Sequence, residues 1–267
     1  MSIVGTPTQL DRGLFRARRV IKQSNLLFVS NLLRAINDAT KSVLFSRALL
    51  EEYLRRHRIF LRSLIPIGVE EEAPRVIRLA ADAALVAGVG PFAAVPGAIA
   101  DLAFEEMLAC GASICLVENG GEIAATSTRP LNVAIYAGDS PLSSRVGFRL
   151  EAEDFPIGIG TSSASISHAL SFGEADAAVA VTSTAALADA FATAICNAVA
   201  GSDVEASVQA GLEAAEEMSQ LRGALIIRGR YVGSVGRLPR FLNLTGNLDD
   251  MFKATLQDFL PQEAIIL

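Results

Sequence analysis

The stretch that decides the fold is GIGTSSASISHALSFGEADAAVAVTSTAALADAFATAICN, which runs from Gly158 to Asn197. Its glycine and hydroxyl residues predict a loop over 158–168, which leads into the apolar strand AAVAVTS and then into an alanine-rich helix. Asp189, Thr193 and Asn197 recur every four residues, so they share one face of that helix. A buried polar stripe needs partners. We therefore expect a ligand or the neighbouring loop to satisfy it.

The composition indicates a globular protein with helices packed closely on a sheet. Half of the 267 residues are apolar, there is no Trp, and the net charge is -6 with a pI near 5.1. Such an acidic balance argues against a general nucleic-acid binder. The cysteines Cys110, Cys115 and Cys196 show no CxxC spacing and predict reduced thiols. The polar start MSIVGTPTQLDRGLFRARR is unlike a secretory signal, so we expect a cytoplasmic protein.

One uncharged segment, residues 83–100, raises the question of a membrane span. It contains Pro91, Pro96 and three glycines and is flanked by Asp82 and Asp101. Its length is borderline for crossing a bilayer. We expect instead two buried helices joined by a tight Gly-Pro turn, and no membrane partner.

The remaining pattern predicts an α+β protein of one domain, 1–267. A hairpin is expected over 13–37 and an amphipathic helix over 41–62, which together form a basic N-terminal region at about 12–62. Helices at 74–88 and 97–110, several strands and the opening stretch form a core at about 74–201. A helix at 203–219, a hairpin turning at 228–230 and a short terminal helix complete a C-terminal part at about 203–267. Because strands cluster and helices come in pairs, strict βαβ alternation is not expected.

The predicted loop is the first candidate binding element. The amides and hydroxyls of Gly160, Thr161, Ser162, Ser163 and Ser165 could hold a phosphate or carboxylate, or they could form an ordinary serine-rich turn. No Gly-Lys-Ser/Thr follows, so it is not a Walker A loop.

Asp189 and Thr193 are the second candidate element. A carboxylate and a hydroxyl one helical turn apart suit Mg²⁺ if a backbone carbonyl joins them. The alternative is that Asp189 forms a hydrogen bond to a nearby loop.

The third candidate element is the turn Asn119, Gly120, Gly121 and Glu122, which follows a predicted buried strand. It is a hairpin turn by default and, because glycine can present its backbone amides freely, a ligand loop by hypothesis. His168 could act as an acid or base near neutral pH, or it could be structural.

Five motifs in order, GVGPFAAVPGAIAD, VENGGEI, IYAGDSPLS, GTSSASISHALSFGEAD and LADAFATAICN, resemble the uncharacterised UPF family of ApbE-like proteins, relatives of the FAD:protein FMN transferases. The resemblance runs from about Arg55 to Gly201. It implies the ApbE-like fold, with helices packed on antiparallel sheets around a central cleft, and makes Mg²⁺ and FAD or FMN the expected cofactors.

The resemblance also assigns roles to particular residues. It places Mg²⁺ on Asp189 and Thr193, with a backbone ligand near Val95. It places the transferase His-Ile-Ile-Asp-Pro motif at 168–172, beginning with His168, and the Gly-Gly-Asp turn at 120–122, ending at Glu122.

Two departures from the transferase pattern concern charge. The lysine of the transferase metal turn corresponds to Pro96, and the aspartate of the histidine motif corresponds to Ser171; no lysine occurs between Lys41 and Lys253. A phosphoryl-transfer site neutralises its substrate with cations, so these departures argue against unaltered transferase chemistry.

Three functions follow as expectations. The first is an ApbE-like protein that binds a small anionic or nucleotide-like, flavin-type ligand, with or without Mg²⁺, and has no assigned reaction. The second is FAD:protein FMN transfer, and the third is a non-enzymatic accessory role, for example in sulfur-metabolism assembly. For the third, the basic face at 12–62 would be the docking surface. A homodimer is expected in each case.

Overall fold

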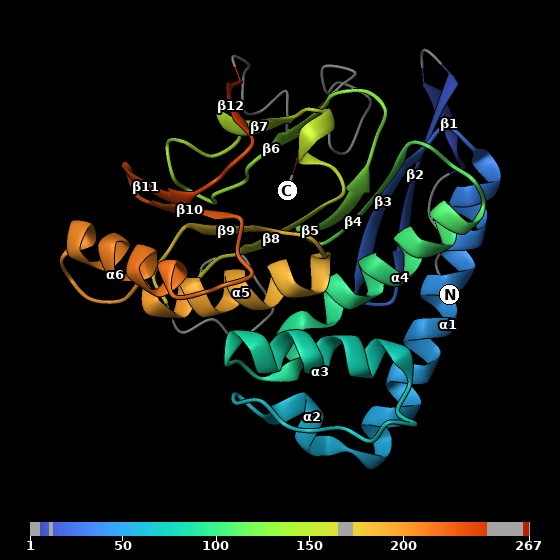
Figure 1. Cartoon of the computed structure of the whole chain (residues 1–267), viewed down its shortest axis with the longest axis horizontal. Helices are drawn as coiled ribbons and strands as arrows, with labels where there is room; N and C mark the ends of the chain where they lie inside the picture. The colour runs from blue at the N-terminus through green and yellow to red at the C-terminus, as the bar shows by residue number, and fades with distance from the viewer. Residues whose placement is uncertain (1–5, 11–12, 165–172, 245–263, 267) are drawn as a thin grey trace.

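The chain forms three layers: helices, a large sheet and a small sheet (Figure 1). The computed structural model describes residues 6–10, 13–164, 173–244 and 264–266. Within these residues the large sheet has nine strands, and every neighbouring pair is antiparallel. In spatial order they are β1 (Thr8–Leu10), β2 (Leu14–Ile21), β3 (Ser24–Ser30), β4 (Cys115–Asn119), β5 (Glu122–Thr126), β8 (Ile157–Ser162), β9 (Ala177–Thr182), β10 (Gly223–Arg228) and β11 (Tyr231–Gly236).

The small sheet covers one face of the large sheet, and the helices cover the other (Figure 1). Its described strands are, in order, β12 (Arg240–Asn243), β7 (Val146–Leu150), β6 (Leu131–Ala134) and β13 (Ala264–Ile266), with β6 and β13 parallel. The helices are α1 (Leu33–Arg56), α2 (Arg58–Arg62), α3 (Arg75–Ala87), α4 (Val95–Ala109), α5 (Ala185–Ala198) and α6 (Val204–Glu216), with short 3₁₀ turns η2 (Pro91–Ala94) and η3 (Ala152–Asp154). The expected α+β class, with helices on antiparallel sheets, is confirmed.

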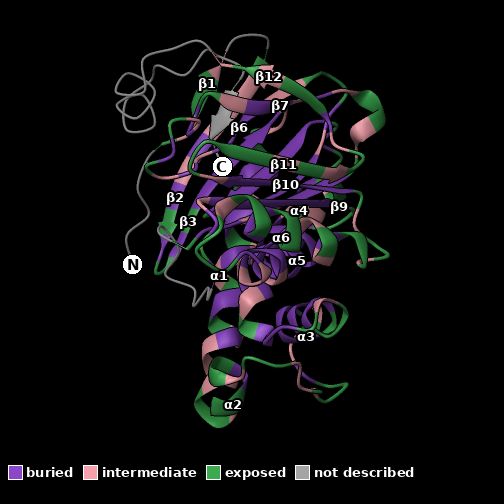
Figure 2. Cartoon of the chain, turned by 90° about the vertical axis from the view of Figure 1, so that its left-hand side faces the viewer, coloured by how far each residue is buried: buried purple, intermediate pink, exposed green. Residues whose placement is uncertain are grey.

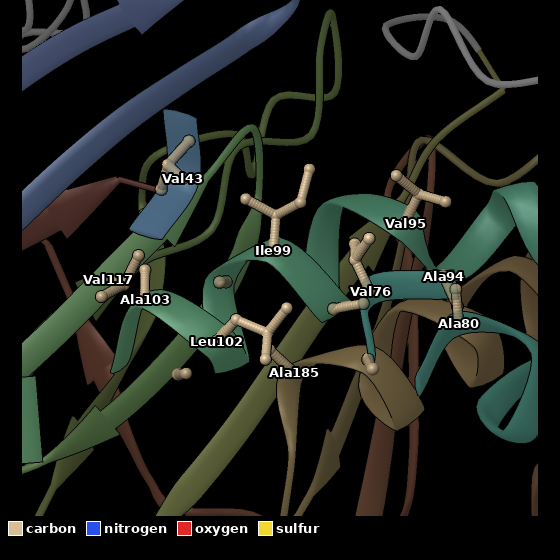
Figure 3. Close-up of a cluster of buried hydrophobic side chains, with 14 of the residues drawn as sticks. Val43, Val76, Ala80, Ala94, Val95, Ile99, Leu102, Ala103, Val117 and Ala185 are labelled. Atoms are coloured by element: carbon tan, nitrogen blue, oxygen red, sulfur yellow. The ribbon is translucent and has the colours of Figure 1, made fainter. Parts of the chain in front are cut away.

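Both faces of the central strands β4, β5, β8, β9 and β10 are buried, which explains their largely apolar sequences (Figure 2). Along β4, Val117 faces the helices, whereas Leu116 packs between the two sheets. In the helical layer, Figure 3 shows side chains of Val76 and Ala80 from α3, Ile99 from α4 and Ala185 from α5. Small residues at these contacts let the helices approach closely.

Helix α5 lies in backbone contact with β8. A Cβ atom placed on Gly160 would lie 2.5 Å from the backbone nitrogen of Asp189, and one on Gly158 would overlap the backbone of Thr184. These glycines alternate with Ile157 and Ile159, which face the small sheet. The prediction of a loop over 158–168 is therefore wrong for 158–162, which belong to β8. The two glycines do not break the strand; they leave room for α5 on its helix-facing side.

Other boundaries also differ from the prediction. The N-terminal hairpin turns at Lys22 and ends at Ser30, and the chain is helical from Leu33, earlier than expected. His57 interrupts the amphipathic helix and separates α1 from α2. The expected terminal helix lies outside the described residues.

The uncharged segment at 83–100 forms the end of α3, η2 and the start of α4, as the Gly-Pro turn predicts. Among the described residues, no single helix is long and apolar enough to cross a membrane; α3 and the helical segment Pro91–Ala109 meet the length and composition criteria only as a pair bent by 111°.

Glu118 is a buried acid on the side of the large sheet that faces the small sheet. It lies opposite Leu27 and Ile123, which belong to the core between the sheets. Its Oε1 accepts a hydrogen bond of 3.1 Å from the amide of Gly121. Burial raises the pKa of Glu118 to about 7, although the positive charge of Arg18 acts in the opposite direction.

Substitution of Gly160 by Ala tests the contact between β8 and α5. Because the new methyl group would meet backbone atoms that cannot rotate away, we expect a loss of about 1–3 kcal/mol in the free energy of unfolding. Gly68→Ala is the matched control, since a Cβ there meets nothing within 4 Å. Urea unfolding of both variants measures the difference. Equal stability of the two would show that α5 does not press on β8.

Substitution of Glu118 by Gln tests the buried charge. The folded-state pKa lies above the ordinary value of 4.5, so the native state holds a proton that the unfolded chain has released. The wild-type chain should therefore lose stability, on the order of 3 kcal/mol from this group, as pH rises from about 4.5 to about 7. Glu118→Gln should remove that part of the pH dependence, whereas Glu153→Gln, at an exposed position, should keep it. Thermal unfolding across this pH range in EDTA measures both, and identical profiles would contradict a buried charge at Glu118.

Candidate functional site

Three segments far apart in sequence meet at the first turn of α4. The amide of Gly97 donates a hydrogen bond of 2.9 Å to Oδ2 of Asp189 on α5. The side-chain Nδ2 of Asn119, at the end of β4, donates one of 2.9 Å to the carbonyl of Pro96. The start of α4 is thus fixed between the β4–β5 turn and α5, and these contacts define the candidate site.

Asp189 is a buried carboxylate at the positive end of a helix. Its contact with Gly97 lies in the first turn of α4, where unpaired amides favour a negative group. Burial nevertheless raises the pKa of Asp189 well above its ordinary value, against the opposing effect of the Gly97 hydrogen bond. Within the described residues, its Oδ1 atom accepts no hydrogen bond.

Glu122 brings a second carboxylate to the same place. It is the first residue of β5, lies opposite Asn119 and is 5% exposed. Burial raises the pKa of Glu122, and the charge of nearby Asp189 raises it further. No ion pair within the described part of the chain neutralises either acid. Two buried acids this close favour either a bound proton or a bound cation.

Thr193 lies one turn beyond Asp189 on α5 and is also buried. Asn197, the third residue of the predicted stripe, is half-buried and lies at the other end of the helix beside Gly173. The alternative, a hydrogen bond from Asp189 to a neighbouring segment, holds for one carboxylate oxygen, because Oδ2 accepts a hydrogen bond from the Gly97 amide. The hydroxyl of Thr193 and the Oδ1 atom of Asp189 are the two oxygens that could still bind a cation such as Mg²⁺.

Val95 is the first residue of α4, two residues before Gly97. A carboxylate, a hydroxyl and a backbone carbonyl are oxygen donors of the kind that Mg²⁺ accepts, so the residues present fit this ion chemically. Among the described residues, no group of three or more His, Cys, Asp or Glu is placed to hold a metal. A cation here would therefore need Thr193, a backbone carbonyl, water or ligand oxygens as well as Asp189.

The hydroxyl residues at the end of β8 divide between the two faces of the sheet. Ser162 lies opposite Ala178 on the helix-facing side, whereas Thr161 lies opposite Val179 on the other side. The buried Oγ1 of Thr161 has no hydrogen-bond partner among the residues that the structure describes. Thr161 therefore points away from the side of the sheet on which Asp189 lies, and only Ser162 of this pair shares that side.

The Asn-Gly-Gly segment is the hairpin turn expected by default. Gly120 and Gly121 have φ angles of 74° and 121°, which side chains disfavour. Their amides donate to the carbonyl of Asn25 and to Oε1 of Glu118, respectively. The expectation of freely presented amides is wrong here, because the turn uses both of them. Ser163 is buried after the end of β8, and Ser165 and His168 lie outside the described residues.

Asp101 is a further buried acid in the interface between α4 and α5, which the sequence reading did not select. Its two carboxylate oxygens accept hydrogen bonds of 2.8 and 2.9 Å from the amides of Ala185 and Ala186, and so cap α5. Burial raises the pKa of Asp101 to about 6. A single acid in the apolar run AIADLAF was the available signal.

The predicted basic face at 12–62 is not one surface. Arg19 and Arg47 are buried, and Arg47 donates to Oγ of Ser24 at 2.9 Å. Arg55 and Arg56 pair with Glu52. The docking surface expected for an accessory role is therefore corrected to a much smaller set of exposed arginines.

Sequence comparison identifies close relatives over most of the chain. The family model described as AbpE bacteria matches residues 10–235. The chain is 37% identical to a UPF0280 protein of Methanocaldococcus jannaschii over 230 residues, which cover 85% of this chain and 93% of the relative. It is 40% identical to a UPF0280 protein of Methanothermobacter thermautotrophicus over 201 residues, covering 75% and 78%.

Solved structures share the fold at low sequence identity. The ApbE protein of Thermotoga maritima superposes with a TM-score of 0.52 at 13% identity, covering 80% of this chain and 94% of that chain. The flavinyl transferase ApbE of Pseudomonas stutzeri gives 0.51 at 14%, covering 83% and 94%. With relatives above 30% identity along most of its length and the same fold as ApbE, the chain belongs to the UPF0280 family of ApbE-like proteins.

Proposed function

We propose that this chain binds a small anionic, nucleotide-like ligand of the flavin type together with Mg²⁺, at the junction of the β4–β5 turn, α4 and α5. The observation that carries the proposal is the buried pair Asp189 and Glu122, which lacks a neutralising cation among the described residues. The ligand class comes from the fold, since the solved neighbours include a flavinyl transferase.

Charge explains why a cation is part of the proposal. A phosphate placed beside two ionised acids is repelled by about 4 kcal/mol per charge pair at 4 Å in a surface-like dielectric. A divalent ion reverses that sign and supplies the positive charge that Pro96, in place of a lysine, does not. Asp189 and Thr193 would hold this ion, with a backbone carbonyl near Val95.

The other candidate residues would complete the ligand site. Asn119 keeps the first turn of α4 in place through the Pro96 carbonyl, and Gly120 and Gly121 shape the turn that carries Glu122. Ser162 and Ser163, with Ser165 of the same segment, would bind phosphate, and Gly160 would keep α5 close enough for Asp189 to reach the site. Thr161, on the other side of β8, would have an indirect role. His168 would orient or protonate the ligand, and Asn197 would contact its outer end.

Isothermal titration with FAD, FMN and ADP, each with and without Mg²⁺, tests the proposal. Asp189→Asn keeps an acceptor for the Gly97 amide but removes the charge, so Mg²⁺-dependent affinity should fall at least about tenfold, or 1.4 kcal/mol. Asp139→Asn, at an exposed position, is the matched control. Unchanged affinity in Asp189→Asn, or ligand binding that ignores Mg²⁺, would overturn the assignment of the metal site.

FAD:protein FMN transfer is the second candidate. The same Asp189 and Thr193 pair supports it, because the resemblance places the transferase metal on these residues. In that reaction the pyrophosphate bond of FAD breaks, a protein hydroxyl oxygen bonds to the FMN phosphorus, and AMP leaves. Incubation with FAD, Mg²⁺ and a threonine-bearing acceptor protein, followed by mass spectrometry, should give the FMN adduct and AMP. Binding of FAD without either product would restrict the chain to the first function.

A non-enzymatic accessory role, including one in sulfur-metabolism assembly, is the third candidate. The exposed arginines of α2 are what remains of its proposed docking surface. We rank it below the other two because the exposed arginines are dispersed and do not define a binding surface for an acidic partner. The buried pair Asp189 and Glu122, in contrast, indicates a specific kind of ligand, one that binds with a cation.

A further inference from the structure

The end of the helical layer carries an exposed apolar and basic surface, which we call the basic tip: Arg58, Ile59, Arg62, Leu64 and Ile65. It lies on α2 and the residues that follow, at the end of the molecule far from the sheets (Figure 2). Ile59, Leu64 and Ile65 are 62%, 55% and 69% exposed. Phe60 is fully buried and anchors the segment, so the exposure of its neighbours belongs to a packed helix.

The two arginines of the basic tip differ from those just before them. Arg55 and Arg56 pair with Glu52, whereas Arg58 and Arg62 form no ion pair or hydrogen bond with any described residue. Unpaired charge beside exposed aliphatic side chains is typical of a recognition surface rather than of a solvated helix face.

A second surface, the acidic groove, has the opposite character. It is a depression of about 300 Å³ between α3, α4 and the start of α5. Val86, Phe104 and Leu187 provide apolar walls, and Asp82 and Glu105 line it, with no Lys or Arg among the described lining residues. Glu105 pairs with Arg75, while Asp82 has no ion-pair partner among the described residues.

The basic tip and the acidic groove are parts of one continuous face. Helix α2 packs on η2, and η2 packs on α3, which forms one wall of the groove. Between them lie further exposed apolar side chains: Leu85 at 68%, Val86 at 47% and Phe92 at 37%. The face therefore presents the unpaired Arg58 and Arg62 at one end, the unpaired Asp82 at the other and largely apolar surface between, interrupted by the exposed Arg78.

We infer that this face is the interface with a second copy of the chain, in which the basic tip of each copy lies against the acidic groove of the other. A two-fold axis near Leu85 would form both contacts at once and close the assembly. The apolar residues between would form its centre, and the charged pairs its rim.

An anionic lipid surface fits this face less well. Headgroups would attract Arg58 and Arg62, but they would repel Asp82 and the exposed run Glu70–Glu72 that follows the basic tip. A second copy offers Arg58 and Arg62 an unpaired acid, Asp82, that the chain already carries, and it covers the apolar residues as well.

Sedimentation equilibrium of the full chain tests the inference. The wild type should be a dimer at micromolar concentration. Arg58→Glu with Arg62→Glu, and separately Asp82→Arg, should each weaken dimerisation at least about tenfold. An equimolar mixture of the two variants should recover dimers, because one contact is then charge-reversed and the other is wild-type. Arg230→Glu, an exposed change on the β10–β11 turn, should have no effect.

Every substituted side chain is exposed, so each variant should fold, and circular dichroism is the check. A wild type that stays monomeric, or a dimer that neither variant weakens, would overturn the interface. Failure of the mixture to recover dimers would overturn the pairing of basic tip with acidic groove. Monomeric protein that sediments with phosphatidylserine vesicles, and loses this on reversal of Arg58 and Arg62, would reassign the face to a membrane surface.

Discussion

Helix α5 lies against β8 and against the first turn of α4 at backbone-to-backbone distance, and the candidate site depends on that closeness. Gly160 on β8 and Gly97 on α4 leave no Cβ atom between the helix and its neighbours. The approach is close enough for the carboxylate of Asp189 to reach the Gly97 amide from within the packed layer. A residue with any side chain at Gly97 or Gly160 would push α5 outward, and Asp189 would lose its partner.

The same closeness sets the electrostatics. Asp189 and Asp101 both project into the interface between α4 and α5, and each binds backbone amides at a helix start. Asp101 is saturated by two amides, so it needs nothing more, and it acts as a cap. Asp189 has one amide and lies near Glu122, and no cation among the described residues balances their charge. This difference in partners separates a structural acid from a candidate ligand-binding acid within one helix pair.

Local features of the sequence predicted a good part of this arrangement. The four-residue spacing of Asp189 and Thr193 predicted their shared helix face, and the Asn119-Gly-Gly segment predicted its hairpin turn, because both depend on neighbouring residues only. The glycines at 158 and 160 led to the prediction of a loop, since composition alone does not distinguish a flexible turn from a strand whose glycines allow a helix to pack against its backbone. The proximity of Glu122 to Asp189 results from the pairing of β5 with β8 and the packing of α5, which no short-range pattern reveals. The burial of Arg19 and Arg47 depends in the same way on long-range packing.

Pro96 shows how one position couples the fold to the chemistry. Proline at the start of α4 fixes the backbone for a helix and has no N–H group to leave unpaired. Its carbonyl accepts the Asn119 side chain, which joins α4 to the β4–β5 turn. A lysine at this position, as in the transferase turn, would place a cation beside Asp189 and Glu122 and neutralise part of their charge. With proline, the turn gains a rigid start, and no cation from the described part of the chain neutralises the acid pair. The site thus combines a rigid backbone with two buried acids that have no cationic partner among the described residues. This combination suits the proposed ligand that binds together with a metal ion.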